Sequence, residues 1–326
     1  MRKALGLTGL LVALIVFTTS WEASHDDGRI SFLTNQNIRN LLTWIGLFGI
    51  FSLAQAIVII TGGIDLSVGS LAALVGISAA MLLDKGQGLH PAIVIPAALG
   101  IGASVGLWHG VLVAKVKLQP FIVTLCGLFL YRGITRLITG DQSEGFGSNT
   151  YPNLRWLGSG IVGDVIAVPF IILILLAIIV GAFLHFTPVG RHLFALGANE
   201  EGARFSGIRT SRLIMLAYAL CGLITAIGGL LLAFKVNSLG PSDFGNFYEL
   251  YAIAGAVLGG CSLRGGSGTV IGVIIGASLF NVLKNLVNIL EIPSQWEYVV
   301  IGVAILIGVG IDELSARRGA TAKRVA

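Results

Sequence analysis

Long apolar runs alternate with short polar segments along the whole chain. A helix that crosses a bilayer needs about 20 predominantly apolar residues, and most of the runs approach that length. We therefore predict ten membrane-spanning helices, at residues 4–19, 38–60, 67–83, 91–114, 121–139, 168–186, 213–234, 250–258, 269–290 and 298–311. The run at 250–258 is too short to cross the membrane alone. We expect either a tilted helix that includes its flanking residues or a re-entrant segment. The predicted fold is an all-α integral membrane protein with a single transmembrane domain over residues 1–326.

The composition strengthens this prediction. Of the 326 residues, 55% are hydrophobic and 11% are charged, and the mean hydropathy is +0.90, whereas about a quarter of the residues in a soluble domain are charged. Arg2 and Lys3 precede a first run of signal-peptide length, but Ser20, Trp21 and Glu22 stand where a small-x-small cleavage site would follow. We expect the first run to be an uncleaved span in contact with lipid.

The distribution of charge predicts the orientation. With ten spans and a cytoplasmic N-terminus, 13 of the 21 basic residues and five of the 16 acidic residues lie inside. Basic residues are enriched in cytoplasmic loops, so we predict that both termini are cytoplasmic, with a short basic tail at about 314–326. The net positive charge follows from this topology, and no nucleic-acid partner is needed to explain it.

Two glycine-rich stretches share one spacing, GGIDLSVGS at 62–70 and GGCSLRGGS at 259–267. The matched positions are Gly62, Gly63, Leu66, Gly69 and Ser70 with Gly259, Gly260, Leu263, Gly266 and Ser267. Such a repeat is expected of a chain with two related halves. Chance is the alternative, because the chain contains 45 glycines.

Both stretches are predicted to break or bend a helix. A glycine costs about 1 kcal/mol in a helix interior, and an ionised Asp65 at the bilayer centre costs about 2.5–3.5 kcal/mol. A bend near the interface avoids both costs, and Asp65 or Ser67 would cap a helix that restarts at Val68. The functional interpretation is an element that lines a path or gate, and the structural one is a tight turn with a good cap. The candidate residues are Gly62, Gly63, Asp65, Ser67, Gly69, Gly259, Gly260, Gly266 and Ser267.

The segment 187–213 is the long polar stretch in the middle of the chain, and it carries four arginines. It predicts a short helix in which Asn199 is the N-cap, Glu200 and Glu201 occupy the first turn, and Gly207 ends the helix in the left-handed conformation. An ordered basic loop on the cytoplasmic side indicates a docking site for a partner. The alternative is an ordinary connecting loop that contains a capped helix.

Polar groups within or beside the apolar runs are few. Ionisable groups in a membrane are functional candidates by default, and His109, Arg132 and Arg136 are such groups. The two arginines lie close enough to a span end to reach the interface, and no role is assigned to them. Small residues are expected to let helices approach closely; they are Gly100, Gly102, Ala103, Gly106, Gly272, Gly276 and Ala277.

The sequence does not support catalysis. The three cysteines are scattered without a metal-site spacing. Ser267 lies in the short G-x-S-G pattern of rhomboid-type proteases, but those proteases need a histidine on a later helix, and all five histidines precede Ser267. No H-E-x-x-H or phosphate-loop motif is present. We predict that the chain is not an enzyme and holds no metal or cofactor, so that any ATP is bound by another chain.

Four motifs in order resemble the permease subunits of bacterial ABC importers for monosaccharides of the ribose, xylose and galactose type. They are GGIDLSVGSLAAL at 62–74, LQPFIVTLCGLFLYRGIT at 118–135, VGRHLFALGANEEGARFSGI at 189–208 and ELYAIAGAVLGGCSLRGGSGTVIG at 249–272. The resemblance implies a subunit of the bacterial inner membrane that pairs with a second permease copy. It also implies a cytoplasmic ATPase that binds ATP and Mg, and a periplasmic sugar-binding protein.

The resemblance further implies that the loop at 187–213 couples the permease to the ATPase. The residues carried over, with Glu200 from the capped helix, are Gly190, Arg191, Ala195, Gly197, Asn199, Glu200, Ala203, Ser206, Gly207 and Ile208. The outer loop at about 140–165 is expected to contact the binding protein. The chain departs from the pattern at Tyr251, where an acidic residue is common, and at Arg264, where a small one is usual.

Several alternatives stay open at this stage. Related ABC permeases carry nucleosides or branched-chain amino acids, and the coupling loop alone does not exclude them. A secondary transporter driven by an ion gradient would need a carboxylate deep in a span, and Asp65 comes nearest to that position. The sequence does not identify the sugar.

Overall fold

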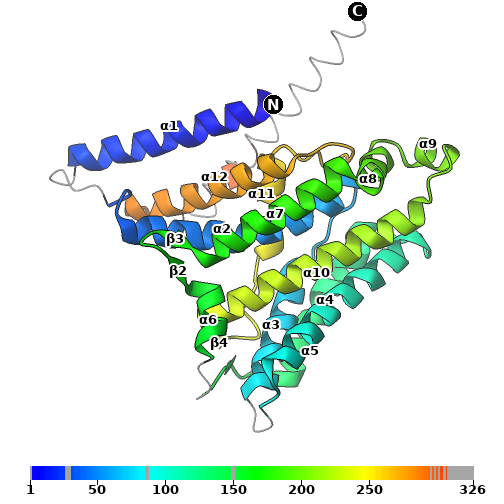
Figure 1. Ribbon diagram of the computed structural model, residues 1–326, viewed down its shortest axis with the longest axis horizontal. Coiled ribbons are helices and arrows are strands. Elements are labelled where there is room, and N and C mark those ends of the chain that lie inside the picture. Colours follow the sequence, from blue (N-terminus) through cyan, green and yellow to red (C-terminus); the bar gives the residue numbers. More distant parts are fainter. Residues whose placement is uncertain are drawn as a thin grey trace, which may run out of the picture.

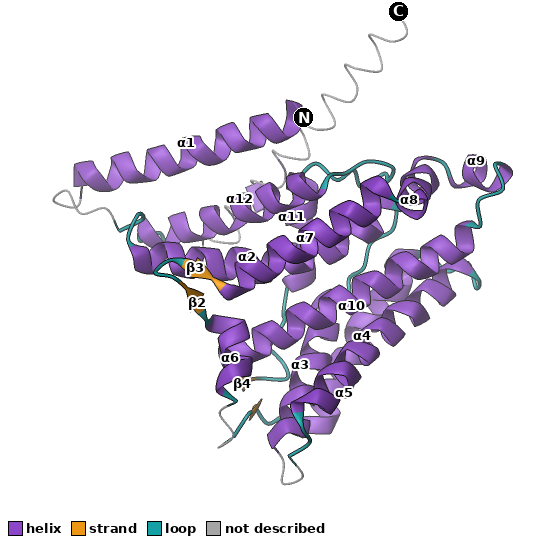
Figure 2. Cartoon of the chain, in the orientation of Figure 1, coloured by secondary structure: helices purple, strands orange, loops and turns teal. Residues whose placement is uncertain are grey.

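The computed structural model describes residues 2–25, 31–84, 88–147 and 151–293, together with 296, 299, 302, 303 and 306. Helices dominate this part of the chain (Figures 1 and 2). The helices are α1 (Arg2–His25), α2 (Asn35–Ile60), α3 (Val68–Asp84), α4 (Pro91–Ala114), α5 (Pro120–Thr139), α6 (Pro152–Ser159), α7 (Val168–Phe186), α8 (Pro188–Ala198), α9 (Glu200–Phe205), α10 (Thr210–Val236), α11 (Tyr248–Leu258) and α12 (Val270–Ile289).

The predicted apolar runs form helices throughout the described ranges. Seven of the described helices are long and apolar enough to cross a membrane: α1, α2, α4, α5, α7, α10 and α12. Helices α3 and α11 are apolar but shorter, as expected for the run at 250–258. The predicted span at 298–311 and the basic tail at 314–326 lie outside the described residues, apart from isolated positions of the former. The chain is therefore an all-α membrane protein.

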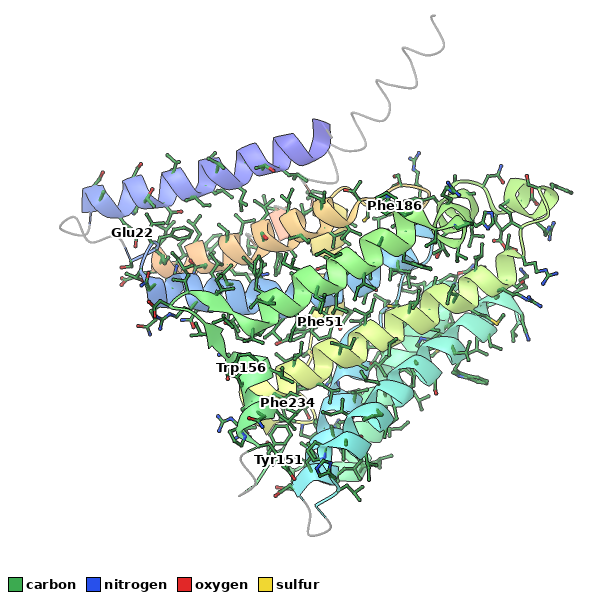
Figure 3. The ribbon with its side chains drawn as sticks, viewed as in Figure 1. Glu22, Phe51, Tyr151, Trp156, Phe186 and Phe234 are labelled. Atoms are coloured by element: carbon green, nitrogen blue, oxygen red, sulfur yellow. The ribbon has the colours of Figure 1, made fainter. Side chains whose placement is uncertain are left out.

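Helix α2 is the centre of the bundle, and nearly all of its membrane-length portion is buried. It packs against α7, α10, α11 and α12. Helix α1 lies outside this group and packs along α12 (Figure 1). The end of α1 is fixed by Glu22, labelled in Figure 3, whose buried carboxylate accepts hydrogen bonds from the backbone N–H groups of Ser31 and Phe32.

Small residues create the closest helix contacts, as the sequence predicted. Helices α4 and α10 cross where a Cβ on Gly106 would collide with the carbonyl oxygen of Tyr218. Helices α11 and α12 cross similarly, because a Cβ on Gly276 would collide with the carbonyl oxygen of Gly255. Gly100 differs, since nothing lies within 4 Å of a Cβ built there.

The loop at 140–165 contains structure that the sequence analysis did not predict. It holds α6 and the two-residue strands β1 (Glu144–Gly145) and β2 (Ile161–Val162). Strand β1 pairs antiparallel with β4 (Ser238–Leu239), and β2 pairs antiparallel with β3 (Ile166–Ala167). These pieces lie at the lower left of Figure 1, whereas α8 and α9 lie at the far right. The two groups of connections therefore occupy opposite ends of the bundle.

Candidate functional site

The polar segment 187–213 folds into two short helices, α8 and α9. The side chain of Asn199 accepts a hydrogen bond from the N–H of Gly202 at 2.9 Å, and Gly207 has a φ of +82°. The predicted N-cap and the left-handed helix end are thereby confirmed. Helix α8 was missed, although its start carries a recognisable signal: Thr187 accepts from the N–H of Gly190 at 3.0 Å, and Pro188 is its first residue.

The ten predicted coupling residues divide into two sets. Six are exposed: Arg191, Ala195, Asn199, Glu200, Ser206 and Gly207. The other four, Gly190, Gly197, Ala203 and Ile208, are buried or half-buried. They pack the two helices onto the bundle, so any docking partner would meet the first set. Phe205 adds an apolar group to that outer surface, with 84% of its area exposed.

The two glycine-rich stretches do break helices. Helix α2 ends at Ile60 and α3 restarts at Val68, as predicted, and α11 ends at Leu258 before α12 begins at Val270. Both preceding helices end in the same way, with a left-handed glycine, Gly62 at φ +84° and Gly260 at φ +90°. In each case the following residue returns a hydrogen bond to the last turn, from Gly63 to Val58 and from Cys261 to Ala256.

The matched spacing of the two stretches does not correspond to matched structure. The sequence pairs Gly63 with Gly260, but the equivalent helix-ending glycines are Gly62 and Gly260. Gly69, a candidate for the break or the path, lies in the first turn of α3, which restarts at Val68 as predicted. A Cβ there would collide with the carbonyl oxygen of Gly245, so close packing explains this glycine. Its counterpart in the spacing, Gly266, lies in the connection between α11 and α12.

The two breaks and the polar segment meet at one place, which we call the junction: residues 60–63, 197–198 and 264–266. The N–H of Gly266 donates to the carbonyl oxygen of Ile60 at 2.9 Å. A Cβ on Gly197 would collide with that same carbonyl oxygen and would lie 2.6 Å from the nitrogen of Gly266. One on Gly265 would lie 2.7 Å from the oxygen of Gly197 and 2.9 Å from the Cα of Gly62. Backbone therefore packs directly on backbone.

One further contact places another loop at this end of the bundle. The ammonium of Lys117, in the turn after α4, lies 3.8 Å from the carboxylate of Glu200 on α9. Both side chains are largely exposed, so the pair contributes little to stability. This pair bears on the topology, because a cytoplasmic N-terminus and the ten predicted spans put the loop after 91–114, the segment 187–213 and the loop after 250–258 on the cytoplasmic side. The structure puts these segments at the same end.

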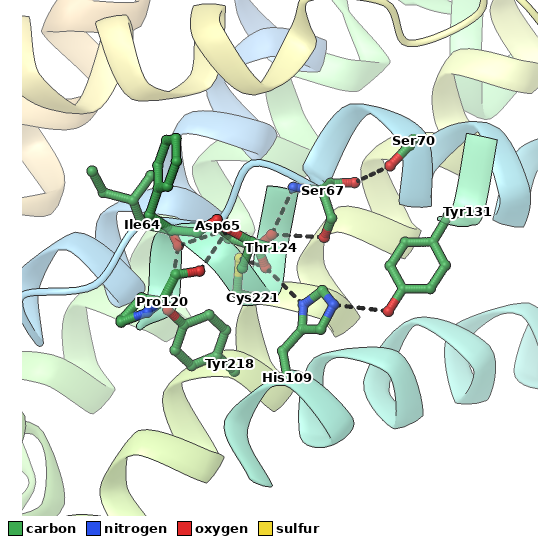
Figure 4. Close-up of polar contacts among 11 residues, drawn as sticks. Ile64, Asp65, Ser67, Ser70, His109, Pro120, Thr124, Tyr131, Tyr218 and Cys221 are labelled. Atoms are coloured by element: carbon green, nitrogen blue, oxygen red, sulfur yellow. Dashed lines mark hydrogen bonds and ion pairs between the residues drawn. The ribbon is translucent and has the colours of Figure 1, made fainter. Parts of the chain in front are cut away.

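A buried polar cluster lies next to the junction (Figure 4). The carboxylate of Asp65 is 1% exposed and accepts hydrogen bonds from the N–H and the hydroxyl of Ser67, at 2.8 and 2.6 Å. His109 Nδ1, from α4, lies 3.7 Å from the other carboxylate oxygen. The Nε2 atom of His109 is hydrogen-bonded to the hydroxyl of Tyr131, from α5, at 2.8 Å.

Further groups fix the backbone of the first break around this cluster. The hydroxyl group of Tyr218 donates to the carbonyl oxygen of Ile64 at 3.3 Å. The hydroxyl of Thr124 lies 3.3 Å from the same oxygen and 2.9 Å from its nearer acceptor, the carbonyl oxygen of Pro120. The side-chain amide of Gln55, oriented to suit its neighbours, donates to the Asp65 carbonyl at 3.3 Å and accepts from the Asp65 N–H at 3.1 Å. Buried polar groups need such partners, so the cluster holds the first break in one shape against α4, α5 and α10.

Sequence reasoning named Asp65 and Ser67 but gave His109 no role and did not consider Tyr131 or Gln55. Their polar atoms inside apolar runs were the available signal. Pairing them required knowledge of which helices are neighbours. Arg136 is exposed and pairs with Asp141 at 2.6 Å, as expected of a side chain near a span end. Arg132 instead donates to the carbonyl oxygens of Pro241 and Phe244, at 2.9 and 2.7 Å.

Comparison with known proteins identifies the family. A family described as branched-chain amino acid transport system / permease component matches residues 37–309. The chain belongs to this permease family. Members of this family are transport components, so the chain is a transport subunit and not itself an enzyme. It is a multi-pass protein of the bacterial inner membrane.

Several relatives are similar over most of their length. The chain is 38% identical to the ribose import permease protein of Escherichia coli K12 over 285 residues, which cover 86% of this chain and 87% of that protein. It is 35% identical to the galactofuranose transporter permease protein of the same strain, covering 91% and 84%. Identity to the xylose transport system permease protein of that strain is 32%, covering 94% and 91%. No solved structure matches the chain.

Proposed function

We propose that this chain is the permease subunit of an ABC importer for a monosaccharide, either a pentose or a hexose. The observation that carries the proposal is its similarity, over more than four-fifths of the chain, to permeases named for ribose, galactofuranose and xylose. The alternative substrates, nucleosides and branched-chain amino acids, are not favoured by these relatives. An ion-gradient transporter is disfavoured as well, although Asp65 is a buried carboxylate, because the matched family is one of permease components.

The proposed topology has ten spans with both termini in the cytoplasm. In it, α8, α9 and the junction face the cytoplasm, whereas α6 and the short strands face the periplasm. The excess of basic residues in the segments assigned to the inside supports this orientation. The contacts of Lys117 with Glu200 and of Gly266 with Ile60 support a common side for those segments.

The proposed partners follow from the two ends of the bundle. A cytoplasmic ATPase subunit, which binds ATP and Mg, docks on the six exposed coupling residues and on Phe205 of α9. A periplasmic sugar-binding protein contacts the loop at 140–165. A second permease copy completes the pathway. This chain itself holds no cofactor.

The junction gives a physical route from the ATPase to the membrane. Helices α2, α11 and α12 each have one end at the junction or directly beside it. Closely packed backbone segments are nearly incompressible. A movement of α8 therefore displaces these three helices. The resulting motion is a rocking of the bundle that alternates access to the two sides.

Transport by the reconstituted complex tests this function. The chain, its co-purifying ATPase and its binding protein are placed in proteoliposomes, and uptake of labelled ribose, xylose, galactose and leucine is measured with ATP inside. The proposal expects uptake of one of the sugars that stops when the phosphate-loop lysine of the ATPase is replaced. Uptake that continues with the inactive ATPase and collapses with a proton ionophore would establish the ion-gradient alternative. Uptake of leucine alone would establish the amino-acid alternative.

A further inference from the structure

A cavity of about 780 Å³ opens at the end of the bundle opposite to the junction. It is bounded by the first turns of α2 and α11, the last turns of α12, and the segment 243–247. Ligand sites for small molecules are typically concave and of about 300–1,000 Å³. The size of the cavity is therefore suited to a compact metabolite with some of its water.

One wall of the cavity is aromatic. The rings of Trp44 and Phe48 are stacked at 5.7 Å with an interplanar angle of 26°. Tyr248 and Tyr251 lie 4.8 and 5.6 Å from Phe48, centroid to centroid. Trp44 and Tyr248 are partly exposed, so their surfaces remain accessible. Such rings offer apolar area together with a polar edge, which suits the C–H face of a sugar ring.

Side-chain amides also line the cavity, half of them from α12. Asn285 and Asn37 exchange two hydrogen bonds, at 2.7 and 3.0 Å, and so link α12 to the start of α2. Asn281 is 4% exposed and donates its Nδ2 to the carbonyl oxygen of Ala277 at 2.8 Å. Within the described part of the chain its Oδ1 accepts no hydrogen bond, although it lines the cavity. An amide oxygen with no partner in the wall of a cavity is a ready acceptor for a hydroxyl group.

Three charged side chains line the cavity, and amides outnumber them. The charged residues are Lys235, Lys284 and Asp243. The ammonium of Lys284 lies over the Tyr251 ring at 4.7 Å and within 6 Å of the Phe48 and Phe280 rings. A cation held over aromatic faces is already stabilised and orders the aromatic wall. Six of the fifteen lining residues are asparagines. The aliphatic side chain of a branched-chain amino acid could not form hydrogen bonds with these amides.

We propose that this cavity is a binding site for a neutral monosaccharide on the permease itself, with the aromatic wall stacking on the sugar ring and Asn281 accepting from a hydroxyl. The proposal rests on the proposed function and adds a site to it. Tyr251, where the sequence departs from the pattern of similar permeases, then contributes to selectivity between sugars. Because α2, α11 and α12 run from this cavity to the junction, occupancy and ATPase movement act on the same three helices.

Direct binding tests the site without the binding protein. The full chain is inserted into lipid nanodiscs, and binding of labelled ribose, xylose and galactose is measured at equilibrium. Wild type is expected to bind one of them saturably. Asn281→Ala and Trp44→Ala, on different helices, are each expected to weaken that binding about tenfold, in line with the loss of a buried hydrogen bond or a stacking surface. Ser278→Ala, one turn away on α12 and outside the cavity lining, is the matched control.

The outcomes separate this site from the proposed function. Equal binding by wild type and both cavity variants would overturn the site, and so would an absence of binding by a chain whose complex imports the same sugar. Binding that depends on Asn281 and Trp44, in a chain whose complex imports no sugar, would support the site and reject the proposed function. Elution volume on size exclusion shows that each variant is folded, and a misfolded Asn281→Ala leaves Trp44→Ala to decide.

Discussion

The two ends of helices α2, α11 and α12 are built in opposite ways. At the junction, backbone packs on backbone, and a single Cβ on Gly197 has no room. At the other end the same helices separate around a cavity of about 780 Å³ lined by amides and aromatic rings. Glycine makes the first arrangement possible, and long polar or aromatic side chains make the second.

This difference indicates a division of labour. Transmission of a displacement needs contacts that cannot be compressed, because packed interiors deform little. Binding needs space and polar groups whose partners come from the ligand. Substitutions that add or remove one group should therefore be costly at the junction and in the polar cluster beside it, and mild on exposed surfaces.

The largest loss of stability is expected for Gly197→Ala. The added Cβ meets the carbonyl oxygen of Ile60, and overpacking of this kind costs about 1–3 kcal/mol. Gly100→Ala is the matched control, since that helical glycine has no neighbour within 4 Å of an added Cβ. Thermal unfolding in detergent should show a lower midpoint for Gly197→Ala only, accompanied by loss of ATP-driven uptake. Equal midpoints for the two variants would contradict close packing at the junction.

Asp65→Ala should be nearly as damaging. It leaves the hydroxyl and N–H of Ser67 without their acceptor and removes the carboxylate that lies 3.7 Å from His109 Nδ1. Each buried group that loses its hydrogen-bond partner costs about 1–3 kcal/mol. Asp65→Asn keeps an acceptor oxygen for Ser67 and should lose less. The order of thermal midpoints is the readout. Wild-type stability in Asp65→Ala would show that the cluster does not hold the first break.

Tyr131→Phe should have a smaller effect. It removes only the hydroxyl that is hydrogen-bonded to His109 Nε2 at 2.8 Å, and a net loss of about 0.5–1.5 kcal/mol follows. Combining it with His109→Ala separates the pair interaction from other effects. If the stability losses of the two single variants add in full in the double variant, the hydrogen bond contributes nothing to stability. Tyr131 is then not part of the cluster.

Phe205→Ala should change the stability of the isolated chain least, by about 0.5 kcal/mol or less, because the side chain is 84% exposed. Its expected effect lies in weaker association with the ATPase. Leu137→Ala is matched in exposure, at 82%, but lies at the opposite end of the bundle. Retention of the ATPase on the immobilised chain should fall for Phe205→Ala alone. Equal retention would exclude α9 from the docking surface.

Local features of this fold could be predicted from sequence, whereas contacts between distant segments could not. Hydrophobic run length located helices such as α4 and α7, and cap chemistry located Asn199 and Gly207. Helix α8 was missed because its polar residues hid the buried Leu193 and Leu196. The shared spacing paired Gly69 with Gly266, although the first packs inside α3 and the second lies in a connection. A glycine required for packing and a glycine required for a turn are identical in sequence.

The candidate sites show the same limit. The junction consists of backbone atoms from three separate segments, so no pattern of side chains in the sequence indicated that these segments are in contact. The pairing of Asp65 with His109 and Tyr131 depends on α4 and α5 lying next to the first break. The cavity depends on asparagines and aromatic residues from four segments, each unremarkable in its own run.

The central claim is that ATPase movement at the junction is transmitted to the cavity. Asn246→Cys places a reporter on the cavity wall, in a chain whose exposed Cys126 is replaced by serine. The rate of its labelling by a water-soluble maleimide is measured in the assembled complex, before and after the ATPase is trapped with nucleotide. The account predicts a several-fold change in rate that is lost in the Gly197→Ala variant. An unchanged rate in a complex that still imports sugar would contradict it.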